Sequence, residues 1–111
     1  MIIMKVLRKF MSKFVYVLNG KVMKSKKQTH IYLKERFDFP DYYGHNLDAL
    51  FDMLTGYNDS TKLNIVLIYT DDLIINQPEY GEKLIITLME ASLANDKIQL
   101  KISPQKSKSI I

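Results

Sequence analysis

The sequence predicts an α/β fold, in which a small three-stranded parallel sheet is packed with helices. Segments with the features of strands and helices alternate along the chain in the order βααβααβ. One apolar run near the middle, LNIVLIY, is typical of a buried strand, and successive strands are separated by enough chain for helical crossovers. With 111 residues and 47% hydrophobic content, the chain has material for one hydrophobic core. These observations favour a single parallel-sheet domain.

The first strand is predicted at residues 14–18 and the first helix at residues 26–37. The segment FVYVL is β-branched and aromatic, and it stops at the turn dipeptide Asn19-Gly20. Ser25 followed by Gln28 resembles a capping box, which marks the start of a helix. The apolar face of this helix is expected to consist of Ile31, Leu33 and Phe37.

The second helix is predicted at residues 47–55. Asn46 is suited to the N-cap, because its side-chain oxygen can accept a hydrogen bond from a free backbone N–H group. Gly56 follows the last helical residue, where glycine commonly adopts left-handed backbone. We therefore expect Gly56 to end the helix in that conformation.

The second half of the chain is expected to add two strands and two helices. The run LNIVLIY (63–69) lacks alternation, which predicts a parallel strand covered on both faces. TDDLIINQ (70–77) is compatible with a short helix, and Pro78 opens a longer helix that runs to about Asn95. KIQLKIS (97–103) alternates between apolar and polar residues, which predicts the last strand.

We predict one domain at residues 14–103, with an N-terminal extension (1–13) and a short tail (104–111). The chain has no cysteine, which suits a reducing cytoplasm. Lysine and arginine interrupt the apolar residues near the N-terminus, so we expect no signal peptide. A membrane-spanning helix needs about 20 apolar residues, and no apolar run in the sequence approaches that length. The expectation is a cytoplasmic protein.

Charge is unevenly distributed along the chain. Residues 1–36 contain ten Lys or Arg and one acid, residues 37–61 contain five Asp and no base, and residues 62–111 contain six of each. The basic third could bind nucleic acid, although a solvated lysine-rich face is the more common outcome. Nucleic acid is the less favoured partner, because no aromatic platform accompanies these lysines in the sequence. The lysines in question are Lys21, Lys24, Lys26 and Lys27.

The helix at 47–55 separates an apolar face from an acidic one. Asp48 and Asp52 lie one turn apart with no Lys or Arg nearby, although like charges at this spacing cost about 0.2–0.5 kcal/mol. Tyrosines flank the helix on both sides, of which Tyr43 is expected in the core. Aromatic rings around exposed carboxylates are typical of a protein-binding surface for a cationic partner. The apolar face consists of Leu47, Leu50, Met53 and Leu54, with Phe51 at its border.

The segment FPDYYGHNLDALFDMLTGY, residues 39–57, is similar to the signature of the barstar family, cytoplasmic inhibitors of secreted bacterial ribonucleases of the barnase type. Weaker agreement runs from VLNG near the first strand through MEA to the last strand, and so covers residues 14–103. The match is long and nearly ungapped. The resemblance implies the family's parallel-sheet fold and a bacterial immunity or antitoxin protein that is not an enzyme and needs no cofactor or metal.

In that family the acidic helix and the preceding loop plug the ribonuclease active site, with a carboxylate in the place of an RNA phosphate. The resemblance assigns this role to Asp52, opposite an Arg and His cluster, with Asp48 as its acidic neighbour. A carboxylate accepts the forked donors of arginine as a phosphate does. Tyr42 would pack over the catalytic histidine of the enzyme. The further contacts that the resemblance implies are Gly44, Asn46, Phe51, Thr55, Tyr57 and Glu90.

Some residues depart from the family pattern. Phe51 and Tyr57 stand where tryptophans are familiar, and His45 stands where an acid is frequent, so we expect the cognate surface to differ from that of other family members. The formal net charge of +4 weakens long-range attraction to a basic enzyme. The partner is therefore expected to be a barnase-like ribonuclease or a related toxin.

Other functional classes stay open beside ribonuclease inhibition. The chain could be an interaction module that keeps the fold without a ribonuclease partner, or the nucleic-acid-binding protein considered above. Asp48 and Asp52 could also be ordinary surface residues, an acid/base pair or metal ligands, but no His or third carboxylate lies at ligand spacing. No nucleophile elbow or phosphate loop appears, so no enzyme is predicted. His30 is expected to be structural or exposed.

Overall fold

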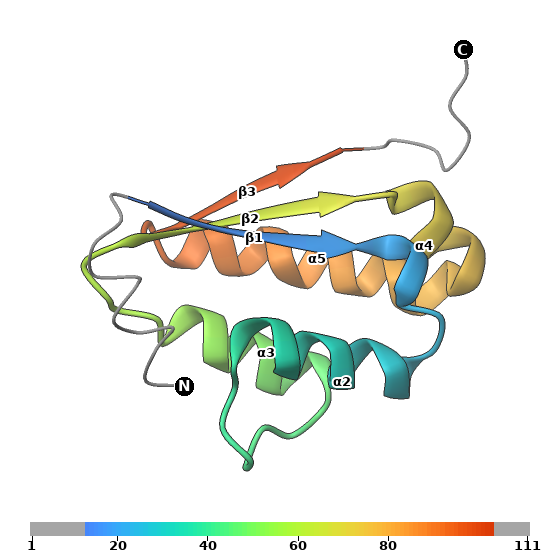
Figure 1. Ribbon diagram of the computed structural model, residues 1–111, viewed down its shortest axis with the longest axis horizontal. Coiled ribbons are helices and arrows are strands. Elements are labelled where there is room, and N and C mark those ends of the chain that lie inside the picture. Colours follow the sequence, from blue (N-terminus) through green and yellow to red (C-terminus); the bar gives the residue numbers. More distant parts are fainter. Residues whose placement is uncertain (1–12, 104–111) are drawn as a thin grey trace.

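The computed structural model describes residues 13–103, which fold around a three-stranded parallel sheet in the order β1-β2-β3 (Figure 1). The predicted fold class is therefore confirmed, and the segment 70–77 does contain a short helix. The elements in chain order are β1 (Lys13–Asn19), a 3-10 turn η1 (Gly20–Val22), α2 (Lys26–Phe37), α3 (Leu47–Thr55), β2 (Lys62–Ile68), α4 (Thr70–Asn76), α5 (Pro78–Ala94) and β3 (Ile98–Ile102).

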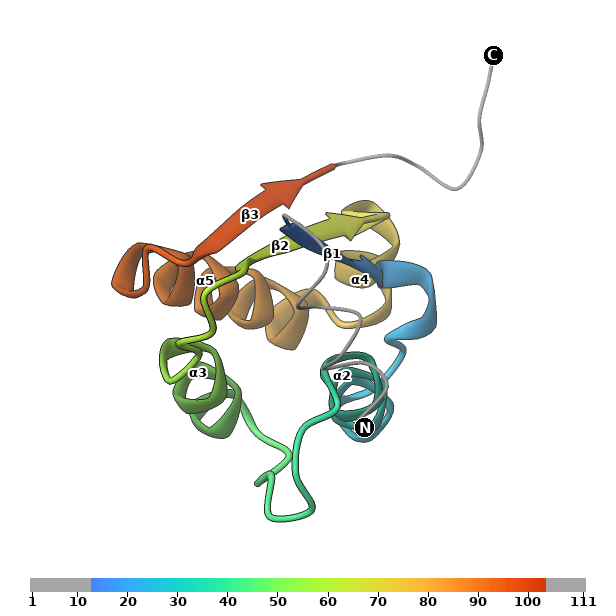
Figure 2. The same cartoon turned by 60° about the vertical axis from the view of Figure 1, so that its left-hand side comes forward.

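The core lies between the sheet and the helices, which occupy one side of the sheet in both views (Figures 1 and 2). Burial alternates along β2, where Leu63, Ile65 and Leu67 are buried and the residues between them are half-buried. Within residues 13–103, β2 is fully covered on one face only, so the prediction that it is covered on both faces is wrong. The alternation is hidden in the sequence, because apolar Val66 and Ile68 occupy the less covered face.

α2 begins at the predicted N-cap, since the Ser25 side chain accepts a hydrogen bond from Gln28 N at 3.2 Å. The expected apolar face is only partly correct. Ile31 is 42% exposed, because residues two apart on a helix are separated by about 200° and Ile31 therefore points away from Leu33. The buried side chains of α2 are Thr29, His30, Leu33 and Phe37.

α5 is the longest of the described helices, with 17 residues. It begins at Pro78, as predicted, and its last residue is Ala94. Gly81, Leu84 and Leu88 lie on its buried face, toward the core. Between residues 13 and 103, no helix combines the length and the apolar character that crossing a bilayer requires.

Gly20 lies where η1 passes very close to the backbone of Tyr69. A Cβ atom on Gly20 would lie 2.2 Å from the Tyr69 carbonyl oxygen, so the backbone would have to move. We expect Gly20→Ala to lower the free energy of unfolding by about 1–3 kcal/mol, the usual cost of overpacking. Urea denaturation followed by circular dichroism measures this change. Gly56→Ala is the control and should lose less, because its Cβ would meet its nearest neighbour at 3.2 Å; equal losses would contradict the steric explanation.

Candidate functional site

The candidate site comprises the loop 38–46 and helix α3, which together form the acidic surface. In both views the loop lies beyond the helices, on the side away from the sheet (Figures 1 and 2). Tyr42 in the loop is 80% exposed, and Asp48 and Asp52 are exposed on α3. Neither aspartate side chain forms a salt bridge or hydrogen bond with another residue of the described chain. Two carboxylates one helical turn apart therefore face solvent without a partner among residues 13–103.

The entrance to α3 is shaped by Asn46, which is the N-cap as predicted. Its Oδ1 accepts a hydrogen bond from Ala49 N at 2.7 Å, and its Nδ2 donates to Gly44 O at 3.2 Å. Space is tight here, because a Cβ on Gly44 would lie 3.2 Å from the Ala49 Cβ. Gly44 and Asn46, both exposed, thus fix the path by which the loop enters the helix.

The other end of α3 is held by Asn95, a residue that the sequence did not single out. Its Nδ2 donates hydrogen bonds to Leu54 O at 3.1 Å, Thr55 O at 3.4 Å and Tyr57 O at 2.8 Å. These carbonyls need no left-handed residue to satisfy them, because the Asn95 amide does so. Gly56 has φ −83° and ψ −4°, so the prediction of left-handed backbone there is wrong.

We expect Asn95→Ala to lower the free energy of unfolding by about 1–3 kcal/mol, because carbonyls at the end of α3 lose their donor in a partly buried site. Thermal denaturation measures the loss. Asn76→Ala, an exposed residue at the end of α4, is a matched control that should have little effect. Equal stability of the two variants would show that water replaces the Asn95 amide without cost.

The inner face of α3 matches its predicted apolar character. Leu50 and Leu54 are buried, and the remaining apolar residues of this face pack partly buried against the core. Phe51 is half-buried, at the border between the apolar and acidic faces. Thr55, also half-buried, donates its hydroxyl to Phe51 O at 2.8 Å. The helix therefore presents its carboxylates outward while Phe51 and Thr55 are only partly accessible.

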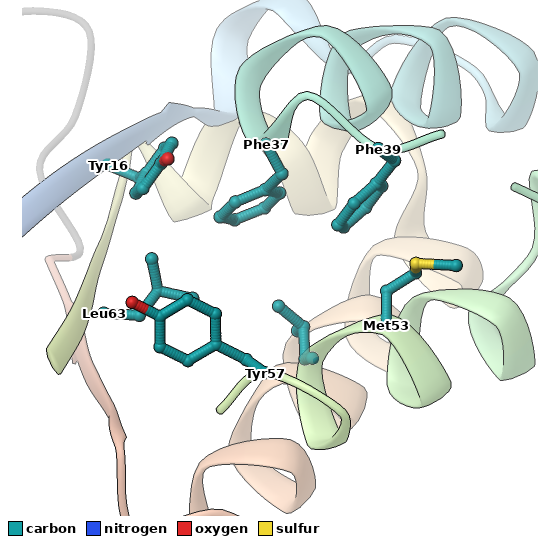
Figure 3. Close-up of a pocket in the computed structure, with 7 residues that line it drawn as sticks. Tyr16, Phe37, Phe39, Met53, Tyr57 and Leu63 are labelled. Atoms are coloured by element: carbon teal, nitrogen blue, oxygen red, sulfur yellow. The ribbon is translucent and has the colours of Figure 1, made fainter. Parts of the chain in front are cut away.

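Tyr57 is half-buried and points inward rather than fully into solvent. Its hydroxyl donates a hydrogen bond to Thr61 O. Its ring lines a cavity of ≈ 50 Å³ between α3, the end of α2 and the sheet, and Figure 3 shows it facing Tyr16, Phe37 and Phe39 across that space. Only part of the Tyr57 ring is available to a partner.

Glu90 is exposed on α5, the helix against which α3 packs. No hydrogen bond or ion pair joins Glu90 to α3 in the described part of the chain. The structure thus brings Tyr42, Asp48 and Asp52 to the exposed surface of one loop and helix, with Glu90 on a neighbouring element. Among the described residues, no three His, Cys, Asp or Glu side chains are arranged to hold a metal ion.

A buried hydrogen-bond network anchors the loop to the core. His30 is 1% exposed, and its Nδ1 and Nε2 lie 2.7 Å from the hydroxyls of Tyr43 and Tyr80 respectively. Burial, with a smaller contribution from the charge of His45, lowers the pKa of His30 to about 4. Burial also raises the pKa of Tyr43 and of Tyr80. Neutral groups therefore link the loop, α2 and α5.

The sequence predicts a core position for Tyr43 and a structural or exposed position for His30. Tyr43, 3% exposed, belongs to the core as predicted, and its ring packs 4.7 Å from that of Phe39, measured between centroids. His30 is structural, and its hydrogen bond to Tyr80 is not evident from the sequence. The spacing His30, Leu33, Phe37 (i, i+3, i+7) places the histidine on the buried face and was the available signal.

The four lysines near the start of α2 are exposed, and η1 lies at the other side of the molecule from α3 in both views (Figures 1 and 2). Two of these lysines do lie over an aromatic ring, which the sequence did not reveal. Lys21 Nζ lies 4.9 Å from the Tyr69 ring centroid, and Lys26 Nζ lies 4.8 Å from that of Tyr80. Both rings are half-buried and already face a lysine, so they differ from the open platforms on which bases stack.

Comparison with known proteins agrees with this geometry. The family described as Barstar (barnase inhibitor) matches residues 13–105, which include the whole described fold and the acidic surface. The protein named "Putative ribonuclease inhibitor YrdF" of Bacillus subtilis (strain 168) is 49% identical over 51 residues. That alignment covers 46% of this chain and 55% of the relative, so the chain matches about half of that protein's length. On the family match and the shared parallel-sheet fold, the chain belongs to the barstar family.

Proposed function

We propose that this chain is an intracellular inhibitor of a barnase-type ribonuclease, and that its acidic surface blocks the active site of the enzyme. The observation that carries the proposal is the pair Asp48 and Asp52, which are exposed one turn apart and have no salt-bridge or hydrogen-bond partner within residues 13–103. Family membership supports the inhibitory role. An immunity or antitoxin function in the bacterial cytoplasm is part of the same proposal.

The charge of the expected partner favours this role for the acidic surface. A ribonuclease binds RNA phosphates with cationic groups, and a carboxylate accepts the paired N–H donors of arginine in similar geometry. Asp52 is the principal phosphate mimic in this proposal, and Asp48 is its acidic neighbour. In the part of the chain that the structure describes, neither carboxylate has an ion pair to give up before it binds, so little of the interaction energy is lost.

The rigidity of α3 strengthens the same argument. Asn46 holds the first turn, and Asn95 satisfies carbonyls at the last turn. A surface whose backbone is already ordered loses little conformational entropy on binding. We expect the acidic surface to meet its partner without rearrangement of the backbone.

Aromatic contacts complete the proposed interface. Tyr42, 80% exposed, can lay its ring over a catalytic histidine of the enzyme, as the resemblance implies. Tyrosine at the centre of an interface is a frequent energetic anchor, and the barnase–barstar pair is itself a standard example of such an interface. The proposed surrounding contacts are Gly44, Asn46, Phe51, Thr55, Tyr57 and Glu90.

The net charge of +4 does not oppose this proposal strongly. The exposed lysines lie in and shortly after η1 in the sequence, and η1 is at the other side of the molecule from α3 (Figure 2). At physiological ionic strength charges are screened over about 8 Å, which is shorter than the distance across a domain of this size. A partner at the acidic surface therefore experiences mainly the local aspartates.

The test is the titration of several barnase-type ribonucleases with the purified chain, with RNA cleavage as the readout. We expect one cognate enzyme to lose its activity at a molar ratio of one to one. If every enzyme stays fully active at saturating amounts of the chain, it is an interaction module of the same fold that has another partner.

A further inference from the structure

His45 occupies an unusual position in the acidic surface. It directly precedes the N-cap Asn46 and adopts left-handed backbone, with φ 55°. Histidine is one of the few residues besides glycine that visit this region with some frequency. The His45 Nδ1 lies 2.8 Å from Tyr43 O, and the two rings pack with centroids 5.1 Å apart. The side chain is thus held in a fixed orientation although the residue is exposed.

The hydrogen bond to Tyr43 O determines the chemistry of the free ring nitrogen. A carbonyl oxygen can only accept, so Nδ1 must carry the proton in this bond. In the neutral ring Nε2 is then an acceptor, and it has no hydrogen-bond partner within residues 13–103. Protonation converts the same atom into a cationic donor. A single proton therefore reverses what His45 offers to a partner.

We propose that His45 is a specificity-determining residue of the acidic surface, and that its neutral form binds by accepting a hydrogen bond at Nε2 from a cationic group of the ribonuclease. This inference rests on the proposed function. His45 lies close in sequence to Asp48, in the first turn of α3. A cation at His45 opposes the same partner groups that Asp48 attracts, so acidification weakens binding.

The titratable surroundings of His45 shape the experiment. The ring contacts Tyr43, whose hydroxyl bonds to buried His30 on α2, and His30 in turn bonds to Tyr80 on α5. The charged groups of the adjoining segments include Asp48 and Asp52 on α3, Asp38 at the start of the loop, and the Lys34–Asp41 pair, joined at 3.2 Å. His30 and the enzyme's own histidines also titrate in acid, so the effect of His45 must be measured as a difference between variants.

His45→Asn is the matched variant. Asparagine tolerates left-handed backbone, can donate an amide N–H to Tyr43 O as Nδ1 does, and does not titrate. The dissociation constant of each protein for the cognate barnase-type ribonuclease is measured from about pH 5.5 to about pH 8, where histidines change charge. Circular dichroism at each pH verifies that both are folded. His45→Asp, which tolerates the same backbone, is the second variant.

The ratio of the wild-type to the His45→Asn dissociation constant should rise as pH falls, by up to about tenfold per pH unit. His45→Asp should bind more tightly than wild type, most clearly at the acidic end. A ratio that does not change with pH, or that falls on acidification, overturns the role of His45 while ribonuclease inhibition stands. If neither wild type nor variant inhibits at any pH, the proposed function itself fails, together with this inference.

Discussion

Asp52→Ala is expected to weaken binding to the cognate ribonuclease by about 3–5 kcal/mol, roughly two to four orders of magnitude in Kd. The reason is that the cationic cluster of the enzyme would be buried in the complex without its principal counter-charge. The free protein should keep its fold, because Asp52 is exposed and its carboxylate has no partner among the described residues. Calorimetric titration of the enzyme measures the loss, and circular dichroism verifies the fold.

Glu82→Ala is the matched control for Asp52→Ala. It removes one exposed carboxylate from α5 and so changes the net charge by the same amount. If the acidic surface is the binding site, Glu82→Ala should bind almost as tightly as wild type. Equal weakening by both substitutions would mean that overall charge, not a specific contact at Asp52, controls affinity.

Acidification from pH 6.5 to about pH 4 is expected to lower the free energy of unfolding by about 3 kcal/mol through His30 alone. Burial lowers the pKa of His30 from 6.5 to about 4 in the folded protein, with a smaller contribution from His45. Between these values the unfolded chain binds a proton that the folded chain does not. The free energy of unfolding therefore decreases as the pH is lowered. Above pH 6.5 His30 contributes no pH dependence, and below about pH 4 the loss is complete.

His30→Gln isolates this contribution from that of the carboxylates, which also titrate near pH 4. We expect the variant to be less stable than wild type at pH 7, because the Tyr43 and Tyr80 hydroxyls lose their shared partner. Its stability should fall less steeply between pH 6.5 and pH 4.5. Urea denaturation at several pH values measures both the free energy of unfolding at pH 7 and its change between pH 6.5 and pH 4.5. Parallel curves for the two proteins would show that His30 binds its proton equally in the folded and unfolded states.

Most of the fold could be predicted because its signals are local. The N-caps Ser25 and Asn46 and the proline at the start of α5 lie within one turn of the features they determine. The errors occur where a distant residue decides the outcome. Gly56 is right-handed because Asn95, 39 positions further along the chain, supplies the hydrogen bonds that a left-handed residue would otherwise help to make.

In the candidate site, too, some features follow from the local sequence and others depend on distant residues. Periodicity places Asp48 and Asp52 away from Leu50 and Leu54, and the structure leaves both aspartates exposed. The inward position of Tyr57 depends on a bond to Thr61 and on packing across a cavity, neither of which periodicity can reveal. The anchor between His30 and Tyr80 joins residues 50 positions apart. Such contacts follow from tertiary packing and not from local pattern.

In the proposed complex the acidic surface occupies the active site of a ribonuclease. The most direct test is the displacement of a fluorescent oligodeoxynucleotide from the active site of the cognate enzyme by increasing amounts of the chain. We expect complete displacement at one equivalent of wild-type protein and far weaker displacement by Asp52→Ala. A ternary complex, in which the enzyme holds the oligonucleotide and the wild-type chain at once, would contradict it.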